Sequence, residues 1–170
     1  MGFFDKIFGS KAAATKFSGQ KMTVLAPIDS TVIPLEQLPD ETFATAILGP
    51  GCGVEPTGDT VYAPFDGTVT QVPESLHAVG MMSDDGIEVL IHVGMDTVEM
   101  QGKSFEAQVK VDQKVKAGTP LLKIDLDAIR AAGHPTATAL IVTNADDLPE
   151  MQIVGGGIVA AGAPLFKFEK

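Results

Sequence analysis

Short apolar runs separated by Pro, Gly and Asp, at intervals of about 8–12 residues, mark the chain from Met22 onward. This rhythm is typical of an all-β sandwich or barrel, whose strands are short and closely spaced. The runs predict strands at 22–26, 61–64, 67–72, 87–93, 104–111, 120–124, 138–143 and 164–168. Short helices are predicted at 40–48 and 125–132, since each begins with an Asp that can cap its first turn. The expected fold is therefore all-β, antiparallel, with a few short helices.

Two internal similarities suggest duplication. Residues 115–124 and 159–168 match at six of ten positions, and Ala26-Pro-Ile-Asp29 resembles Ala63-Pro-Phe-Asp66. Two copies are too few for a solenoid, so we expect a duplicated strand-turn-strand unit within one sandwich or barrel. The glycine cluster at 49–53 is interpreted as a close-packed turn, because it lacks the Lys and Ser or Thr of a phosphate-binding loop.

The first twenty residues differ from the rest and are predicted to be a flexible tail, leaving 21–170 as a single domain. Phe3, Phe4, Ile7 and Phe8 lie at near-helical spacing beside Lys6, a pattern that allows peripheral contact with a membrane surface. Contact with the domain or with nothing is the alternative. No window reaches the roughly 18 apolar residues that a spanning helix needs.

Composition narrows the classes of partner and compartment. The chain has 170 residues, 45% of them hydrophobic, enough for one core. Its 22 Asp and Glu against 12 Lys and Arg give a formal charge of −10, so we expect basic protein partners and no nucleic acid. The single cysteine, Cys52, cannot form an intramolecular disulfide and no secretion signal is present, so a cytoplasmic location is expected.

His92 is the most distinctive of the three histidines. Alternation along 87–93 places Ile87, Val89, Ile91 and Val93 on one face of a strand and leaves His92 on the other, just before Gly94. A glycine there leaves an imidazole accessible. The pattern alone leaves two interpretations open, a structural histidine and a reactive one.

Further segments make this region more specific. Residues 40–49, 56–58, 63–67, 77–78 and 86–98, followed by Gly102 and Phe105, resemble in order and spacing the glucose-type IIA component (phosphocarrier protein) of the bacterial phosphoenolpyruvate:sugar phosphotransferase system. Ile91-His-Val-Gly-Met-Asp-Thr-Val98 is the strongest of these motifs. The resemblance extends from about Met22 to the C-terminus. The opening Met1-Gly-Phe-Phe-Asp-Lys-Ile-Phe8 is similar to free-standing members, so we expect no fragment of a larger permease.

The resemblance implies a β-sandwich with a shallow active depression and a phosphotransferase component as the activity. By this similarity His92 accepts the phosphoryl group on Nε2 from phosphorylated HPr and passes it to a cysteine of a permease IIB domain during sugar uptake. His77 hydrogen-bonds the phosphoryl oxygens, and Ser75 orients His77 where the family usually has Thr. Asp40 and Asp96 match acidic positions that pair with arginines of both partners.

The resemblance also implies an apolar rim that a docking protein covers. The residues that match this rim are Phe43, Ile47, Leu48, Val79 and Val98, with Leu90 beside them. Ordinary core packing is the alternative for each. Pro73 and Leu76 depart from the family pattern near His77, and Gln71 stands where a basic residue can occur, so details of docking and regulation follow less directly.

Two other functions stay open. His92-x-x-x-Asp96 fits a zinc hydrolase of related sheet architecture, but the downstream His-x-His is missing and His134 stands alone. A purely regulatory binding protein is the second alternative.

No cofactor is expected to be required for phosphoryl transfer. In the family, two such histidines can also share a regulatory zinc with glycerol kinase, so His77 and His92 are candidate ligands, and sugar transporters and adenylate cyclase are candidate regulatory partners. The sequence does not name the sugar.

Overall fold

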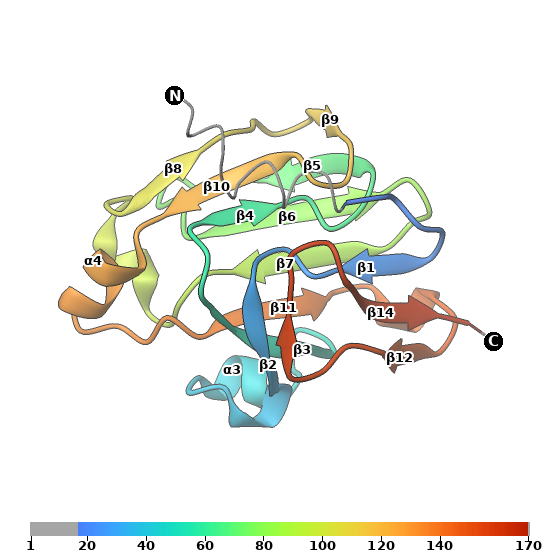
Figure 1. Cartoon of the computed structure of the whole chain (residues 1–170), viewed down its shortest axis with the longest axis horizontal. Coiled ribbons are helices and arrows are strands. Elements are labelled where there is room, and N and C mark those ends of the chain that lie inside the picture. Colours follow the sequence, from blue (N-terminus) through green and yellow to red (C-terminus); the bar gives the residue numbers. More distant parts are fainter. Residues whose placement is uncertain (1–16, 170) are drawn as a thin grey trace.

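An eight-stranded antiparallel sheet is the largest of the three sheets in the structure (Figure 1). The computed structural model describes residues 17–169. The order of strands in this sheet is β13-β2-β3-β11-β7-β6-β5-β9. Their bounds are β2 Ser30–Pro34, β3 Gly51–Pro56, β5 Gly67–Gln71, β6 Ala78–Ser83, β7 Glu88–His92, β9 Lys114–Val115, β11 Thr138–Val142 and β13 Ile158–Val159.

Two three-stranded antiparallel sheets pack against the large sheet. One has the order β1-β14-β12 and the other β4-β10-β8. Their bounds are β1 Thr23–Leu25, β4 Thr60–Tyr62, β8 Phe105–Ala107, β10 Pro120–Ile124, β12 Met151–Ile153 and β14 Pro164–Phe168. The main core joins all three sheets: Val24 and Phe166 from one small sheet and Leu121 from the other lie in one buried cluster with Val89 and Ile91 of the large sheet. The predicted all-β antiparallel sandwich is confirmed.

Among residues 17–169 the helices are few and short. They are η1 Leu35–Gln37, α3 Glu41–Ala44, η2 Thr97–Met100, α4 Leu126–Ala131 and η3 Ala145–Asp147. Asp40 and Asp125 cap α3 and α4 as predicted, accepting hydrogen bonds from the backbone N–H of Thr42 and Ala128. The helix predicted to reach residue 48 ends at Ala44, because Ala46 has a left-handed φ of 61° that α-helices do not accommodate. Within the described chain no helix combines the length and apolarity needed to cross a bilayer.

The predicted duplication appears as an approximate two-fold symmetry of the large sheet. Strands β13-β2-β3-β11 on one side correspond to β9-β5-β6-β7 on the other. β9 joins Gly67 of β5 through Val115, and β13 joins Ser30 of β2 through Val159. Across β11 and β7, Ala139 pairs with His92 and Ile141 pairs with Leu90. A two-fold axis midway between these two pairs relates His92 to Ile141. The two halves share an architecture, and only one of them carries histidine at this position.

The two similar turns hold the duplicated halves in the same way. The carboxylate of Asp66 accepts a 2.8 Å hydrogen bond from the N–H of Ala117, and that of Asp29 accepts a 2.8 Å bond from Ala161. Backbone bonds repeat the correspondence: Gly118 N–H donates to the Ala63 carbonyl and Gly162 N–H to the Ala26 carbonyl, both at 2.9 Å. Each Ala-Pro-x-Asp turn therefore closes onto one of the two similar segments.

The glycine cluster was interpreted wrongly as a turn, since residues 51–56 form β3, a central strand. The glycines are needed there for packing rather than for turning. A Cβ at Gly51 would lie 2.0 Å from the carbonyl oxygen of Leu140 on β11, and one at Gly53 would lie 2.5 Å from Cδ2 of Leu38. The absence of side chains lets neighbouring segments come close.

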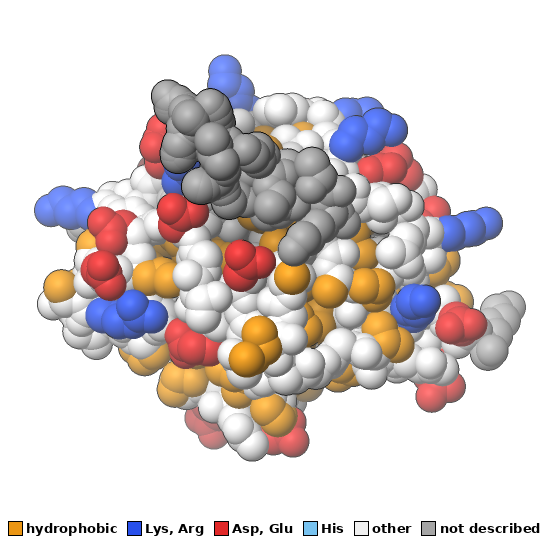
Figure 2. Space-filling view, viewed as in Figure 1, with side chains coloured by type: hydrophobic (Ala, Val, Ile, Leu, Met, Phe, Trp, Pro, Cys, Tyr) orange, Lys and Arg blue, Asp and Glu red, His pale blue; other side chains and the backbone are white. Residues whose placement is uncertain are grey.

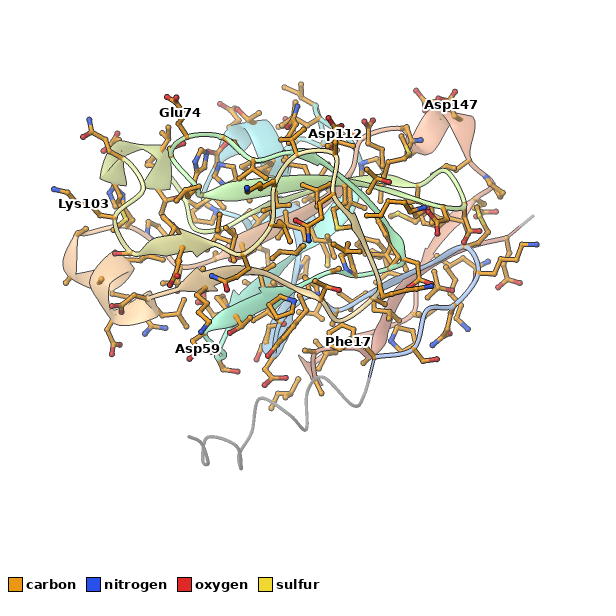
Figure 3. The ribbon with its side chains drawn as sticks, turned by 90° about the horizontal axis from the view of Figure 1, so that it is seen from above. Phe17, Asp59, Glu74, Lys103, Asp112 and Asp147 are labelled. Carbon is orange, nitrogen blue, oxygen red and sulfur yellow. The ribbon has the colours of Figure 1, made fainter. Side chains whose placement is uncertain are left out.

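A flexible tail was predicted at residues 1–20. Residues 1–16 lie outside the described part of the chain, so the amphipathic pattern of the tail stays a prediction. Phe17 lies against the domain, with its ring 5.3 Å from that of Tyr62 on β4. Seen from above, Phe17 lies on the opposite side of the sandwich from Glu74, which precedes the Ser75–His77 segment (Figure 3).

Candidate functional site

His92 ends β7, a central strand of the large sheet. The face of the strand on which His92 lies was predicted correctly: Ile87, Val89 and Ile91 are buried in the main core, whereas His92 is only partly buried. Its cross-strand neighbours are Ala78 on β6 and Ala139 on β11, directly opposite on either side. Methyl side chains at these positions leave more space beside the imidazole than larger ones would.

One hydrogen bond fixes the tautomer of His92. Its Nδ1 lies 2.9 Å from the carbonyl oxygen of Gly94. A carbonyl can only accept, so Nδ1 must carry a proton. In the neutral ring Nε2 is then unprotonated and has its lone pair available as a nucleophile. Gly94 adopts a φ of +72°, a left-handed conformation that suits glycine and turns its carbonyl back toward the ring.

His77 lies beside His92 and is held from two directions. The N–H of Val93 donates a 2.7 Å hydrogen bond to the His77 carbonyl. The Ser75 hydroxyl lies 2.7 Å from His77 Nδ1, made possible by a bend at Leu76, whose φ is 58°. The two imidazole rings have centroids 4.8 Å apart and meet nearly edge to face. The structure thus brings together all three residues predicted for the chemistry: Ser75, His77 and His92.

Both rings are neutral near pH 7. Burial lowers the pKa of His77 to about 4, with repulsion from His92 acting in the same direction. Burial also lowers the pKa of His92 below its ordinary value; the hydrogen bond to Gly94 and the carboxylates of Asp40 and Asp96 oppose that shift only partly. A neutral imidazole is the form that can act as a nucleophile.

A second, smaller core covers the outer face of the large sheet next to His92. We call the segment 35–48 the cover, because its Leu38 and Phe43 pack on Ala139 and Ile141 of β11. The ring of Phe43 lies 4.9 Å from that of His92, although only 5% of Phe43 is exposed. Asp40, at the start of α3, is partly exposed. The cover thus supplies one apolar wall of the site and one carboxylate.

The predicted apolar rim is retained only in part. Ile47, Leu48 and Val98 are 74%, 41% and 52% exposed, large values for apolar side chains, so they can form the rim. Val79 is fully buried, because its position on β6 points inward to the main core, and its prediction as a partner contact was wrong. Leu90 is partly buried against the cover.

Sequence reasoning missed two features of the site. The cross-strand alanines could be identified only after the strand register was known. Thr97 was not singled out either, although its buried hydroxyl bonds the Val93 carbonyl one residue before Gly94. Its place in the strong 91–98 motif was the available signal.

The site does not have the ligands of a metal hydrolase. Among residues 17–169 no group of three or more His, Cys, Asp or Glu side chains is arranged to hold a metal ion. A catalytic zinc needs three protein ligands. Two adjacent imidazoles could provide two ligands and no more, so the zinc hydrolase alternative is not favoured.

Comparisons with known proteins agree with this geometry. Residues 22–148 match the family model described as phosphoenolpyruvate-dependent sugar phosphotransferase system, EIIA 1. A mannose-specific EIIBCA component of Corynebacterium glutamicum is 43% identical over 79% of this chain and 20% of its own length. The chain spans about a fifth of the length of several such multidomain relatives.

Two further relatives match over nearly their full lengths. A glucose-specific EIIA component of Bacillus cereus is 36% identical over 94% of each chain. The solved structure of glucose permease IIA from Mycoplasma capricolum superposes with a TM-score of 0.81 and 33% identity, covering 87% of this chain and 96% of that one. The chain therefore belongs to the EIIA 1 family of the phosphoenolpyruvate-dependent sugar phosphotransferase system.

Proposed function

We propose that this chain is a phosphocarrier of sugar uptake, which accepts a phosphoryl group from phosphorylated HPr on His92 Nε2 and passes it to a cysteine of a permease IIB domain. The observation that carries the proposal is the hydrogen bond from His92 Nδ1 to the Gly94 carbonyl, which leaves Nε2 unprotonated. In the first transfer the P–N bond of the donor breaks as the Nε2–P bond forms. In the second the Nε2–P bond breaks as the cysteine sulfur takes the phosphoryl group.

His77 acts in this proposal as the donor to the transferred group. A phosphoryl group on His92 brings about −1.5 to −2 charges into a protein that is already acidic. The His77 ring is in contact with that of His92, so an N–H of His77 can offset part of this charge. When the Ser75 hydroxyl donates to His77 Nδ1, the single ring proton of neutral His77 is on Nε2 and available to a phosphoryl oxygen.

Docking uses charge and apolar contact together. Over the whole chain 22 Asp and Glu stand against 12 Lys and Arg, and acidic side chains are exposed even on the face shown in Figure 2, where no His side chain is visible. Asp40 and Asp96 act on His92 electrostatically, so arginines of a docked partner would neutralise charge close to the reacting nitrogen. Ile47, Leu48 and Val98 would be covered by the partner, which excludes water from a labile P–N bond.

Phosphotransfer in a reconstituted system tests the proposal. The chain is incubated with phosphoenolpyruvate, enzyme I and HPr, and its intact mass is measured. We expect one added phosphoryl group, lost in acid, absent in His92→Ala and retained in the matched control His134→Ala. A chain that binds phosphorylated HPr without gaining mass would instead be a purely regulatory binding protein.

The remaining expectations form part of the same proposal. The named relatives are specific for different sugars, mannose and glucose among them, and a protein that contacts only other proteins does not select the sugar itself. The transfer needs no cofactor and is placed in the cytoplasm, where HPr is found. A regulatory zinc would use His77 and His92 with a third ligand from a bound protein such as glycerol kinase.

A further inference from the structure

We propose that Thr97 is a positioning residue for His92: its hydroxyl fixes the segment whose next carbonyl holds the Nδ1 proton and keeps Nε2 free. Its effect on phosphoryl transfer rests on the proposed function, whereas its effect on the tautomer of His92 does not. Thr97 opens η2 and is fully buried.

Both backbone polar groups of Val93 are fixed by the site. The Thr97 hydroxyl donates a 2.5 Å hydrogen bond to the Val93 carbonyl, and the Val93 N–H donates to the His77 carbonyl at 2.7 Å. The Val93 carbonyl belongs to the peptide that leads into Gly94. That peptide is planar, so its orientation, together with the dihedral angles of Gly94, sets where the Gly94 carbonyl lies relative to the His92 ring.

The segment is held on its other side by the loop before β11. The N–H of Met95 donates a 3.1 Å hydrogen bond to the Pro135 carbonyl. A Cβ at Gly94 would lie 2.6 Å from Thr97 Cγ2 and 3.0 Å from the Pro135 carbonyl oxygen, so Gly94 is enclosed between the two. The Thr97 methyl packs against Gly94, while the hydroxyl anchors Val93.

The consequence for His92 is chemical rather than only structural. Which ring nitrogen carries the proton depends on the hydrogen bond made by the other. If the Gly94 carbonyl moves away, Nδ1 loses its acceptor, and the population with the proton on Nε2 increases. That tautomer has no lone pair on Nε2 and cannot accept a phosphoryl group there.

Two substitutions separate the hydroxyl from the methyl group. Thr97→Val keeps the shape and removes the hydroxyl, whereas Thr97→Ser keeps the hydroxyl and loses the methyl. The ring nitrogens of His92 are followed by ¹⁵N NMR in the unphosphorylated protein near neutral pH. We expect a protonated Nδ1 in wild type and in Thr97→Ser, and nitrogen shifts moved toward a mixture of tautomers in Thr97→Val.

Transfer from phosphorylated HPr is measured on the same proteins. We expect Thr97→Val to load about 10–100-fold more slowly, by analogy with the loss of residues that orient histidines in metal sites, with Thr97→Ser close to wild type. Thr23→Val is the matched control, because Thr23 on β1 is also buried and its hydroxyl also donates to a backbone carbonyl, that of Lys21. Urea unfolding shows whether each variant is folded under the assay conditions.

An unchanged His92 tautomer in Thr97→Val would overturn the proposal. So would equal losses of transfer in folded Thr97→Val and Thr23→Val, which would indicate a general cost of removing a buried hydroxyl. If the wild-type protein accepts no phosphoryl group, the proposed function fails, but the NMR comparison still decides the role of Thr97.

Discussion

The imidazole of His77 meets that of His92 with ring centroids 4.8 Å apart and ring planes inclined by 80°. Two imidazolium cations at this distance would repel each other, and burial further disfavours charge on either ring. The pair is therefore neutral near pH 7, with one ring able to supply a lone pair and the other an N–H. This division of roles is what a protein-to-protein phosphoryl carrier requires.

Replacing His77 should separate the two half-reactions. In His77→Ala, Nε2 of His92 is unchanged, so we expect loading from phosphorylated HPr to persist. Onward transfer to a IIB domain should be slower by about 100-fold or more, because the donor to the phosphoryl oxygens is missing. Rapid-quench measurement of labelled phosphoprotein follows both steps, with His134→Ala as control. Onward transfer at the wild-type rate would refute the role given to His77.

The depressed pKa of His77 predicts a pH-dependent contribution to stability. Its pKa is about 4 in the folded protein against an ordinary 6.5, so the unfolded chain binds more protons between these values. Stability should therefore rise with pH across this window, and this contribution should be complete above pH 6.5. The lowered pKa of His92 makes a contribution to stability that also rises with pH.

Urea unfolding of wild type and His77→Gln at about pH 5 and about pH 7.5 checks this prediction. The gain in unfolding free energy between the two pH values should be smaller in the variant. Carboxylates titrate alike in both proteins, so their contribution cancels in the difference. An equal gain in both proteins would show that His77 titrates normally in the folded state.

Asp40→Asn should lower the pKa of His92 further. The Asp40 carboxylate raises this pKa against the larger effect of burial, and asparagine removes the charge. The Asn side-chain oxygen can still accept from the Thr42 N–H, so α3 keeps its cap. NMR titration of the His92 ring measures the shift, with Asp147→Asn in the distant η3 as control. A His92 pKa that is unchanged or higher in Asp40→Asn would contradict this electrostatic account.

The apolar rim should contribute to docking through Ile47. Ile47 is 74% exposed on the cover next to the site, so Ile47→Ser should leave the fold intact. We expect weaker binding of phosphorylated HPr by about 5–30-fold, corresponding to about 1–2 kcal/mol. Ile158→Ser is the matched control, since Ile158 is 89% exposed on β13, at the opposite edge of the large sheet from β9 and four strands away from β7. Equal effects of the two substitutions on affinity would remove Ile47 from the docking surface.

The two Asp turns should contribute similarly to stability. Each carboxylate accepts a backbone N–H, that of Ala117 for Asp66 and that of Ala161 for Asp29. Asp29→Ala and Asp66→Ala should each lower the free energy of unfolding by about 1–2 kcal/mol. Urea unfolding measures both, with Asp147→Ala expected to stay within about 0.5 kcal/mol of wild type. A loss in only one of the two would show that the turns are similar in sequence but not in function.

Much of the fold followed from the sequence where local signals were strong. β10 and β14 were predicted at their observed bounds, because a Gly-containing turn precedes each and the apolar run that follows begins at Pro. β3 was missed because its glycines resemble a turn, and only the close approach of β11 and Leu38 explains them. The family prediction is confirmed, since it depended on the order and spacing of many residues.

The candidate site was predictable to a different degree for each residue. The motif placed His92 at a strand end, and the resemblance placed Ser75 and His77 beside it, as the distances bear out. The prediction of Val79 as a partner contact was wrong because the neighbouring sequence does not reveal which face of β6 points inward. The sequence could not foresee the Gly94 carbonyl as a partner of His92 either, because a left-handed loop brings it back to the ring.

The reciprocal closure of the two Asp turns also constrains how the chain can be made. The Asp66 turn closes onto residues 117–119, but the Asp29 turn closes onto residues 161–163, and β1 pairs with β14. During synthesis the first strands emerge well before the last, so they must wait for partners that are translated at the end. The native sandwich can therefore form only after nearly the whole chain has left the ribosome. A truncation before residue 161 would leave β1 and the Asp29 turn without these partners.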